Sequence, residues 1–437
     1  MIKYIYRKFS YATVFLTVFA VSGIFPSPLP AQDVKKLSWQ DCIHAAEMNN
    51  PDLISAREKV IQYASDRKIV ISGLLPQISA SASGTRSRKD SGISGGDAVN
   101  SYSYGVSAKQ LIFDGFKSVY DVKGAGADLD AARFEYQVTS SEVRYNLRKA
   151  YISMIKAKEM LAIAEEITNR RNHIYELVKM RYNAGKEHIG SLHSVQADLM
   201  QAKADAASAS RDLALANTTL CHLMGYDGTA RVEVGGKLEI TAKYSGEPDF
   251  ALLAGNTPAV KKSALAAESA YYALKSSRLD YSPRVYGNAS AGRQGETLSE
   301  MSNEWSVGFE ITAPLFEGGK TYYSESKADS LHRQALSDQR SVKNTTVSSL
   351  REAWNSLKNS IDNLDAESMS LKASTERSNI GEMQYTIGTL SFDNWTIIEN
   401  NLASAKKSYL NACAAAMDSE AQWIQSKGET IENETQN

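Results

Sequence analysis

The sequence predicts a mainly α-helical protein with some β-structure, built from one unit that occurs twice. Two stretches, Met180–Gly185 and Met383–Gly388, share Met, Tyr and Gly at an offset of 203 residues, and apolar residues follow each Gly at spacings of three and four. Such spacing marks one face of a helix, and a Gly at this place commonly ends the preceding helix. A fixed long offset indicates internal duplication. We therefore expect two tips at which a long helix turns into a returning helix.

Two prolines locate the repeats. Pro51 corresponds to Pro258 at an offset of 207, whereas Gly115 corresponds to Gly318 at 203, so the copies differ by four residues in a loop between these points. We expect the first repeat over 32–247, the second over 248–426 and a disordered polar tail over 427–437. The expected elements are helices at 37–74, 115–185 and 189–224, a β-hairpin at 76–113 and a linker at 225–247, then helices at 248–281, 318–388 and 392–426 with a β-hairpin at 283–315.

A seven-residue repeat runs through both long helical segments. Leu350, Leu357, Leu364 and Leu371 recur every seven residues, and Leu147, Met154 and Leu161 occupy the matching places in the first copy. A repeat of this period is a coiled-coil seam. The fold is thus expected to contain long coiled-coil hairpins of helices. The helix before each β-hairpin and the helix after each tip together match the length of one long helix, so we expect them to stack end to end along it.

The first 31 residues resemble a secretory signal. Three basic residues fall within the first eight, and an apolar core from Thr13 to Ile24 leads into a Pro-rich stretch. The core is too short for a typical membrane span, although an uncleaved anchor remains the alternative. Cleavage after Gly23 or after Ala31 fits the pattern, and no Cys near either position supports a lipid-anchored N-terminus.

The two β-hairpins show alternation of apolar and polar residues over about ten positions. In an exported protein this pattern predicts transmembrane barrel strands with lipid on one side and water on the other, and the alternative is a sheet on a soluble core. Large side chains favour the membrane, because they share the parity that would face lipid: Tyr102, Tyr104, Trp305, Val307 and Phe309. Lys109 and Glu310 lie on the opposite parity, toward the barrel lumen.

Four strands cannot close a barrel, and an open sheet edge is not tolerated in lipid. Several subunits must therefore contribute to one oligomeric transmembrane β-barrel. The residues alone require more than one subunit without fixing the number.

Composition and motifs argue against several other functions. Lys and Arg total 49 against 50 Asp and Glu, so no basic field points to nucleic acid. Cys42, Cys221 and Cys413 form no C-x-x-C pair and are expected to be apolar filler. His188 and His193 are five apart, which is off the spacing of a helical zinc pair. No phosphate loop or nucleophile motif is present, so we expect neither an enzyme nor a cofactor or metal site.

The ordered set of these features resembles the TolC family of outer-membrane efflux and secretion channels. Pro314-Leu-Phe-Glu-Gly-Gly319 opens the second long helix and Tyr385-Thr-Ile-Gly388 closes it. The resemblance implies a homotrimer in the outer membrane of a Gram-negative cell, with a shared twelve-stranded barrel and a long periplasmic helical tunnel. It also implies a periplasmic adaptor protein and an inner-membrane pump of the RND, ABC or MFS type.

The resulting functional hypothesis is a passive exit duct of a tripartite efflux or type I secretion system. The alternative is a periplasmic coiled-coil scaffold or adaptor, which would show one helical hairpin flanked by soluble β-domains instead of two copies with alternating strands. The transported substrate is not encoded in this chain, because the pump selects it.

The resemblance places the closed end of the channel at the helix tips. Residues at or beside the two tips are candidates for the aperture: Asp393, Tyr385, Gly388, Gly185, Gly190 and Ser191. Gly190 and Ser191 stand where family members commonly carry an Asp partner for the Tyr, and Asp393 stands near a place where they often carry two acids. Asp393 either forms a cation-attracting ring or only caps the helix that begins near Phe392.

Overall fold

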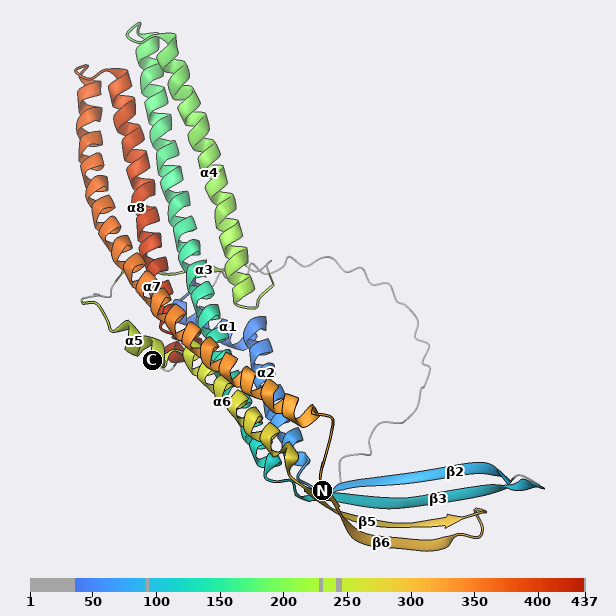
Figure 1. Cartoon of the computed structure of the whole chain (residues 1–437). Helices are drawn as coiled ribbons and strands as arrows, with labels where there is room; N and C mark the ends of the chain where they lie inside the picture. The colour runs from blue at the N-terminus through green and yellow to red at the C-terminus, as the bar shows by residue number, and fades with distance from the viewer. Residues whose placement is uncertain (1–35, 92–93, 228–230, 241–245, 436–437) are drawn as a thin grey trace, which may run out of the picture. The chain divides into compact units, whose positions relative to one another are not determined.

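The computed structural model describes residues 36–91, 94–227, 231–240 and 246–435 (Figure 1). The expected signal peptide at 1–31 lies outside the described residues. The predicted fold class is confirmed: two long helical hairpins are combined with two β-hairpins. Within these ranges, no helix has both the length and the hydropathy that a membrane-spanning helix requires.

The first copy contains four helices and two long strands. These are α1 (Trp39–Asn49), α2 (Pro51–Ser72), β2 (Gln77–Ser91), β3 (Ser94–Phe113), α3 (Lys117–Asn183) and α4 (Ile189–Leu223). The second copy repeats this order with α5 (Phe250–Asn256), α6 (Pro258–Arg278), the short 3₁₀ helix η1 (Leu279–Tyr281), β5 (Arg284–Gly295), β6 (Ser302–Thr312), α7 (Lys320–Thr386) and α8 (Phe392–Ser426). A parallel pair of two-residue strands, β1 (Lys36–Leu37) and β4 (Glu233–Val234), and the short α9 (Ile431–Thr435) complete the described elements.

Each helix that precedes a β-hairpin is divided in two by a proline. Asn50 has an extended backbone, and its side chain accepts from the amides of Asp52 and Leu53 at 3.0 and 3.2 Å. Pro51 then occupies the first turn of α2, where its missing amide costs nothing. Thr257 and Pro258 make the same break between α5 and α6.

The Asn50 side chain also joins α2 to α4. Its Nδ2 donates to the carbonyl of Leu223 at 2.9 Å, so the end of α4 lies at the junction of α1 and α2. Helix α3 packs against both α2 and α4. The end-to-end arrangement expected from the helix lengths is therefore present in the first copy.

The four long strands form one antiparallel sheet in the order β2-β3-β5-β6. The contact between β3 and β5 joins the two copies. In the described sheet β2 and β6 each have one strand partner, so they form its edges. The helices follow the same order, because α2 packs on α3, α3 on α6 and α6 on α7 (Figure 1).

The seven-residue repeat supplies part of the core within each copy. Leu350 and Leu357 are fully buried with Trp354, Phe250 and Trp423 in one cluster. The first copy contributes a larger cluster that contains Leu147, Met154 and residues of α1, α4 and α9. Farther toward the tip, Leu364 and Leu371 are only half-buried. The seven-residue repeat of α7 is therefore packed most tightly at Leu350 and Leu357 and less tightly toward the tip.

The expectation of a disordered tail over 427–437 is wrong for the residues of α9. Ile431 is fully buried. The carboxylate of Glu432 accepts from Tyr136 and Ser140, each at 2.6 Å, and that of Glu434 accepts from Trp39 at 2.9 Å and pairs with Arg144. The segment reads as polar because its partners are polar side chains of α1 and α3, far away in the sequence.

Candidate pore-lining and entrance residues

One face of the four-stranded sheet is polar. Residues directly opposite each other on neighbouring strands point to the same side, and the register pairs Lys109 with Asn288 and Tyr286 with Glu310. Lys109 Nζ lies 3.5 Å from Glu310 Oε2 and 4.1 Å from the centre of the Tyr286 ring. Asn288 donates to the same carboxylate oxygen at 3.5 Å. The structure thus brings the two predicted lumen residues together on one face.

Serine hydroxyls continue this polar face along the strands. Three cross-strand pairs lie within hydrogen-bonding distance, at 2.8 to 2.9 Å: Ser79 with Ser107, Ser83 with Ser103, and Ser290 with Ser306. Sequence reasoning selected only the charged residues as lumen candidates and missed this row of hydroxyls. The alternation of Ser with Ala and Val was the signal that could have identified it.

The opposite face of the sheet is apolar and exposed. Trp305, Val307 and Phe309 on β6 have at least 75% of their surface exposed. Tyr102 and Tyr104 on β3 share this face, because Tyr104 pairs with Arg293, which pairs with Asn303, two positions from Trp305. The sheet therefore has the separation into apolar and polar faces that its sequence predicts, except near the hairpin loops, where Arg293 and Asn303 lie on the apolar side.

The two helix tips have the same backbone turn. Gly185 and Gly388 have φ values of 70° and 84°, a region that favours glycine. After each Gly, the next amide bonds to a carbonyl five residues earlier, Lys186 to Arg181 and Thr389 to Gln384, both at 2.9 Å. This is a Schellman turn, and it explains why Gly closes each long helix.

The helices that leave the tips begin with different caps. His188 Nδ1 accepts from the amides of Gly190 and Ser191 at 3.1 and 3.3 Å, and Ser191 is buried against it. At the second tip the hydroxyl of Ser391 accepts from the amide of Asn394 at 3.4 Å. Asp393 lies exposed in the first turn of α8. Because Ser391 is the cap, the Asp393 carboxylate is not the group that accepts the first amides of α8.

Tyr385 is buried where the two tips meet. Its ring stacks on Trp395, with centroids 4.1 Å apart and planes at 15°, and the guanidinium of Arg181 lies 4.7 Å from the ring centre. Its hydroxyl donates to Glu187 Oε1 at 3.3 Å. Burial raises the pKa of Tyr385 to about 12, and the Glu187 carboxylate acts in the same direction. The hydroxyl therefore stays protonated and available as a donor.

The partner of Tyr385 within the chain is Glu187, in the first tip turn, and not the Gly190–Ser191 pair that was considered from the resemblance. Gly190 and Ser191 are engaged by the His188 cap. The equivalent of Tyr385 in the first copy, Tyr182, is 37% exposed whereas Tyr385 is 1% exposed. The sequence signal for Glu187 was its place two residues after Gly185, at the tip itself.

The comparisons with known proteins identify the family. Residues 42–226 and 251–429 match the family model described as outer membrane efflux protein. The chain belongs to this family. Outer membrane protein TolC of Vibrio cholerae is 22% identical over 411 residues, which covers 91% of each chain. Alkaline protease secretion protein AprF of Pseudomonas aeruginosa is 24% identical over 410 residues, 88% of this chain and 84% of the relative.

Solved channel structures show the same fold. The Neisseria gonorrhoeae MtrE outer membrane channel in its open state aligns with a TM-score of 0.81 at 20% identity, covering 91% of this chain and 90% of the other. The Campylobacter jejuni CmeC outer membrane channel aligns with a TM-score of 0.80 at 18% identity, covering 90% and 88%. As a member of the outer membrane efflux protein family, the chain is an outer-membrane exit channel for efflux or secretion, and its family consists of channel proteins.

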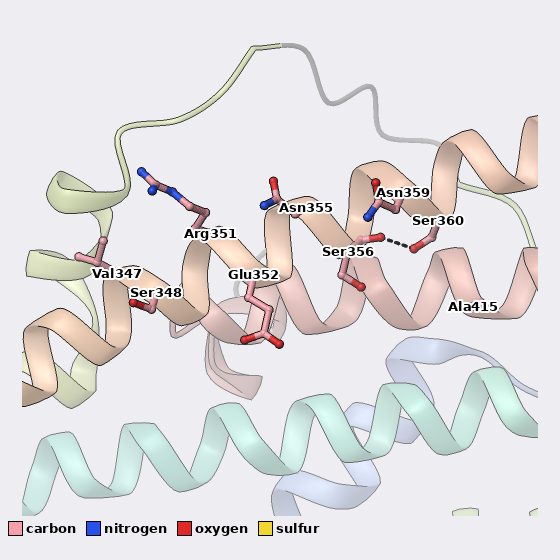
Figure 2. Close-up of a pocket in the computed structure, with 9 residues that line it drawn as sticks. All are labelled: Val347, Ser348, Arg351, Glu352, Asn355, Ser356, Asn359, Ser360 and Ala415. Carbon is pink, nitrogen blue, oxygen red and sulfur yellow. Dashed lines mark hydrogen bonds between the residues drawn. The ribbon is translucent and has the colours of Figure 1, made fainter.

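A groove of about 760 Å³ beside α7, lined mainly by polar residue types, does not change this assignment (Figure 2). Figure 2 shows Arg351, Asn355 and Asn359 pointing to one side of α7 and Glu352 to the other. Glu352 and Arg351 therefore do not point toward a common site. Among the described residues no three His, Cys, Asp or Glu side chains are grouped as a metal site.

Proposed function

We propose that three copies of this chain form the exit duct, and that a periplasmic adaptor joins the duct to an inner-membrane pump that selects the substrate. The observation that carries the proposal is the described sheet: it has one apolar exposed face, one polar face and two edges with a single strand partner each. Such a sheet is stable in lipid only when its edges pair with further copies. Substrates then pass along the polar face without being changed.

The internal repeat supports a neighbouring copy at a defined place. Where β3 leads into α3, Gly115 packs so tightly that an added Cβ would clash with the Ser282 side chain. Where β6 leads into α7, the equivalent Gly318 has nothing within 4 Å of such an atom. Phe113 is 41% exposed, whereas its equivalent Phe316 is 90% exposed. The second junction lacks the cover that the first junction receives from the second repeat.

The residue that could cover the second junction is the first-copy equivalent of Ser282. Ser282 follows its equivalent in the first copy, Leu75, by 207 residues, and Leu75 is 57% exposed two residues before edge strand β2. We infer that Leu75 of one subunit covers the junction at Gly318 of the next, just as Ser282 covers Gly115 within one chain. Edge strand β6 would then pair with β2 of the neighbour, which closes the ring.

The entrance of this duct is assigned to the tips. One Asp393 per subunit would reach the axis, where a ring of carboxylates in a constriction attracts cations and repels anions. Its exposure and the presence of Ser391 as the cap support this role over capping. The contacts of Tyr385 with Glu187 and Arg181 would hold the tip of α7 against that of α3 in the closed duct.

Outer-membrane extracts test the proposal directly. Unheated samples are expected to migrate as a trimer on denaturing gels and heated samples as a monomer, because membrane barrels resist detergent until heated. Recovery of the chain as a soluble periplasmic monomer would instead support the scaffold or adaptor alternative. Recovery in the inner-membrane fraction with an intact N-terminus would contradict both the localisation and the cleaved signal.

A further inference from the structure

A polar cluster joins α3 to α7 and α8 several helical turns before the tips. Arg170 of α3 forms a bidentate pair with Glu399 of α8, with Nη2 at 2.9 Å from Oε1 and Nε on the other oxygen. Nη2 also donates to the hydroxyl of Ser378 at 2.7 Å, and this hydroxyl donates to Glu399 at 2.7 Å. Glu399 and Ser378 are buried. We call Arg170, Ser378 and Glu399 the clamp.

The clamp is a stronger connection than the contacts at the tip. Bidentate, charge-assisted hydrogen bonds of this length are among the strongest in proteins. At the tip, Tyr385 reaches Glu187 at 3.3 Å, Arg181 reaches the Tyr385 carbonyl at 3.4 Å, and Arg181 lies 3.7 Å from Glu187. Arg170 precedes Arg181 by 11 residues, which is about 16 Å along a helix.

The clamp exists on only one of the two kinds of seam that the repeat creates. At an offset of 203, Arg170 corresponds to Ala373, Glu399 to Gln196, and Ser378 to Tyr175. In the proposed trimer these equivalents face each other between subunits. They contain no charge, so these positions cannot form an equivalent ion pair between subunits.

We propose that Arg170 is a positioning residue for the entrance: through Glu399 and Ser378 it fixes the α7–α8 hairpin to its own α3, so that movement of the tip is confined to the segment beyond the clamp. This inference rests on the proposed location of the entrance at the tips. When the tip contacts separate, the hairpin pivots at the clamp and the helices behind it keep their packing. Loss of the clamp lets the hairpin move as a whole and opens the entrance further than loss of a tip contact does.

The test compares single-channel conductance in planar bilayers. R170M/E399M replaces the pair, in which Glu399 is buried and Arg170 is 33% exposed, by apolar side chains of similar volume. Such an exchange is often neutral for stability, and Ser378 can bond back to a carbonyl of its own helix. We expect a conductance at least twofold above the wild type, and above that of the tip variant Y385F, which lacks the hydroxyl that donates to Glu187, with an unchanged trimer melting temperature. K407M/D205L, which removes a half-exposed pair between α8 and α4 at 3.0 Å, is the matched control and is expected to conduct as the wild type does.

Wild-type conductance in an intact R170M/E399M trimer would overturn the inference while leaving the channel assignment in place. An increase in this variant without any effect of Y385F would retain the clamp and disprove the role of the tip hydrogen bond. If the double variant forms no trimer, the conductance of R170K is measured instead. Lys keeps the charge but cannot form the bidentate pair, so an intermediate conductance supports the clamp and a wild-type value contradicts it.

Discussion

Trp39 of α1 donates a 2.9 Å hydrogen bond from its indole Nε1 to the carboxylate of Glu434 in α9, and this bond joins the first and last helices of the described chain. The same carboxylate pairs with Arg144, whose side chain is buried. The Nε and Nη1 atoms of Arg144 are buried without a hydrogen-bond partner in the described structure. Glu434 is thus the main compensation for this charge.

Glu434→Gln is expected to destabilise the folded subunit. Removing one partner of a buried ion pair leaves the other charge uncompensated, at a cost of roughly 3 kcal/mol. The melting temperature of the purified trimer measures the effect. Glu429→Gln is the control, because the Glu429 side chain is 41% exposed and its ion pair with Lys427 is 3.9 Å long, which predicts a change below about 1 kcal/mol. Equal melting temperatures for both variants would show that the contacts of Glu434 with Arg144 and Trp39 do not stabilise the fold.

Acid pH is expected to weaken the packing of α9 against α1 and α3. Burial opposes ionisation of Glu434, but hydrogen bonds from Arg144 and Trp39 outweigh it and lower its pKa below the ordinary value. For Glu432 burial is likewise outweighed by bonds from Ser140 and Tyr136, so its pKa is lowered too. A lowered folded pKa contributes stability that is present above the unfolded pKa, about 4.3, and lost as pH falls through the folded value.

We therefore expect the stability of the wild type to fall between neutral pH and acid pH more steeply than that of a variant with Gln at both positions. Melting temperatures of wild type and E432Q/E434Q measured from pH 7 to pH 3 give the comparison. The two curves should converge toward pH 3. Parallel curves would mean that neither carboxylate is linked to folding.

The predictable parts of the fold were those that local physics decides. Gly185 and Gly388 were identifiable because a helix end with positive φ favours Gly. The two faces of the sheet followed from alternation, because a strand turns successive side chains to opposite sides. Both signals lie within a few residues of the structure that they predict.

The remaining contacts depend on residues far apart in the sequence. Tyr182 and Tyr385 occupy equivalent turns of the two copies, yet only Tyr385 is buried, because Trp395 and the opposite tip cover it. Arg170 and Glu399 are separated by 229 positions and look like ordinary surface charges of two helices. Only the packing of α3 against α8 shows that they meet.

Labelling of introduced cysteines tests the two faces of the sheet. In the assembled barrel, cysteines at Val307 and Phe309 are expected to react with lipid-phase probes, and a cysteine at Glu310 with aqueous thiol reagents. The physical reason is that an outward Lys109 would cost about 2 to 4 kcal/mol near the bilayer midplane. The native Cys42, Cys221 and Cys413 are buried, and the unsubstituted chain gives their background. Reversed labelling would show that the polar face meets lipid.

Replacement of Asp393 by Asn tests the entrance. If three carboxylates ring the constriction, Asp393→Asn should reduce the preference for cations and weaken block by multivalent cations, while the trimer melts as the wild type does. The reason is that an exposed side chain beside a Ser391 cap contributes little to the start of α8. Reversal potentials in a salt gradient measure the preference.

A capping role for Asp393 predicts the opposite result, because a negative charge in the first turn stabilises a helix by about 0.3 to 1 kcal/mol. The variant would then melt earlier and keep its selectivity. Ser391→Ala separates the two effects: it removes the hydroxyl that accepts the Asn394 amide, which costs about 1 kcal/mol, and leaves every carboxylate in place. A ring predicts that S391A changes melting and D393N changes selectivity. Unchanged selectivity in D393N would move the aperture to Tyr385 and Glu187, whose contact is the next constriction to test.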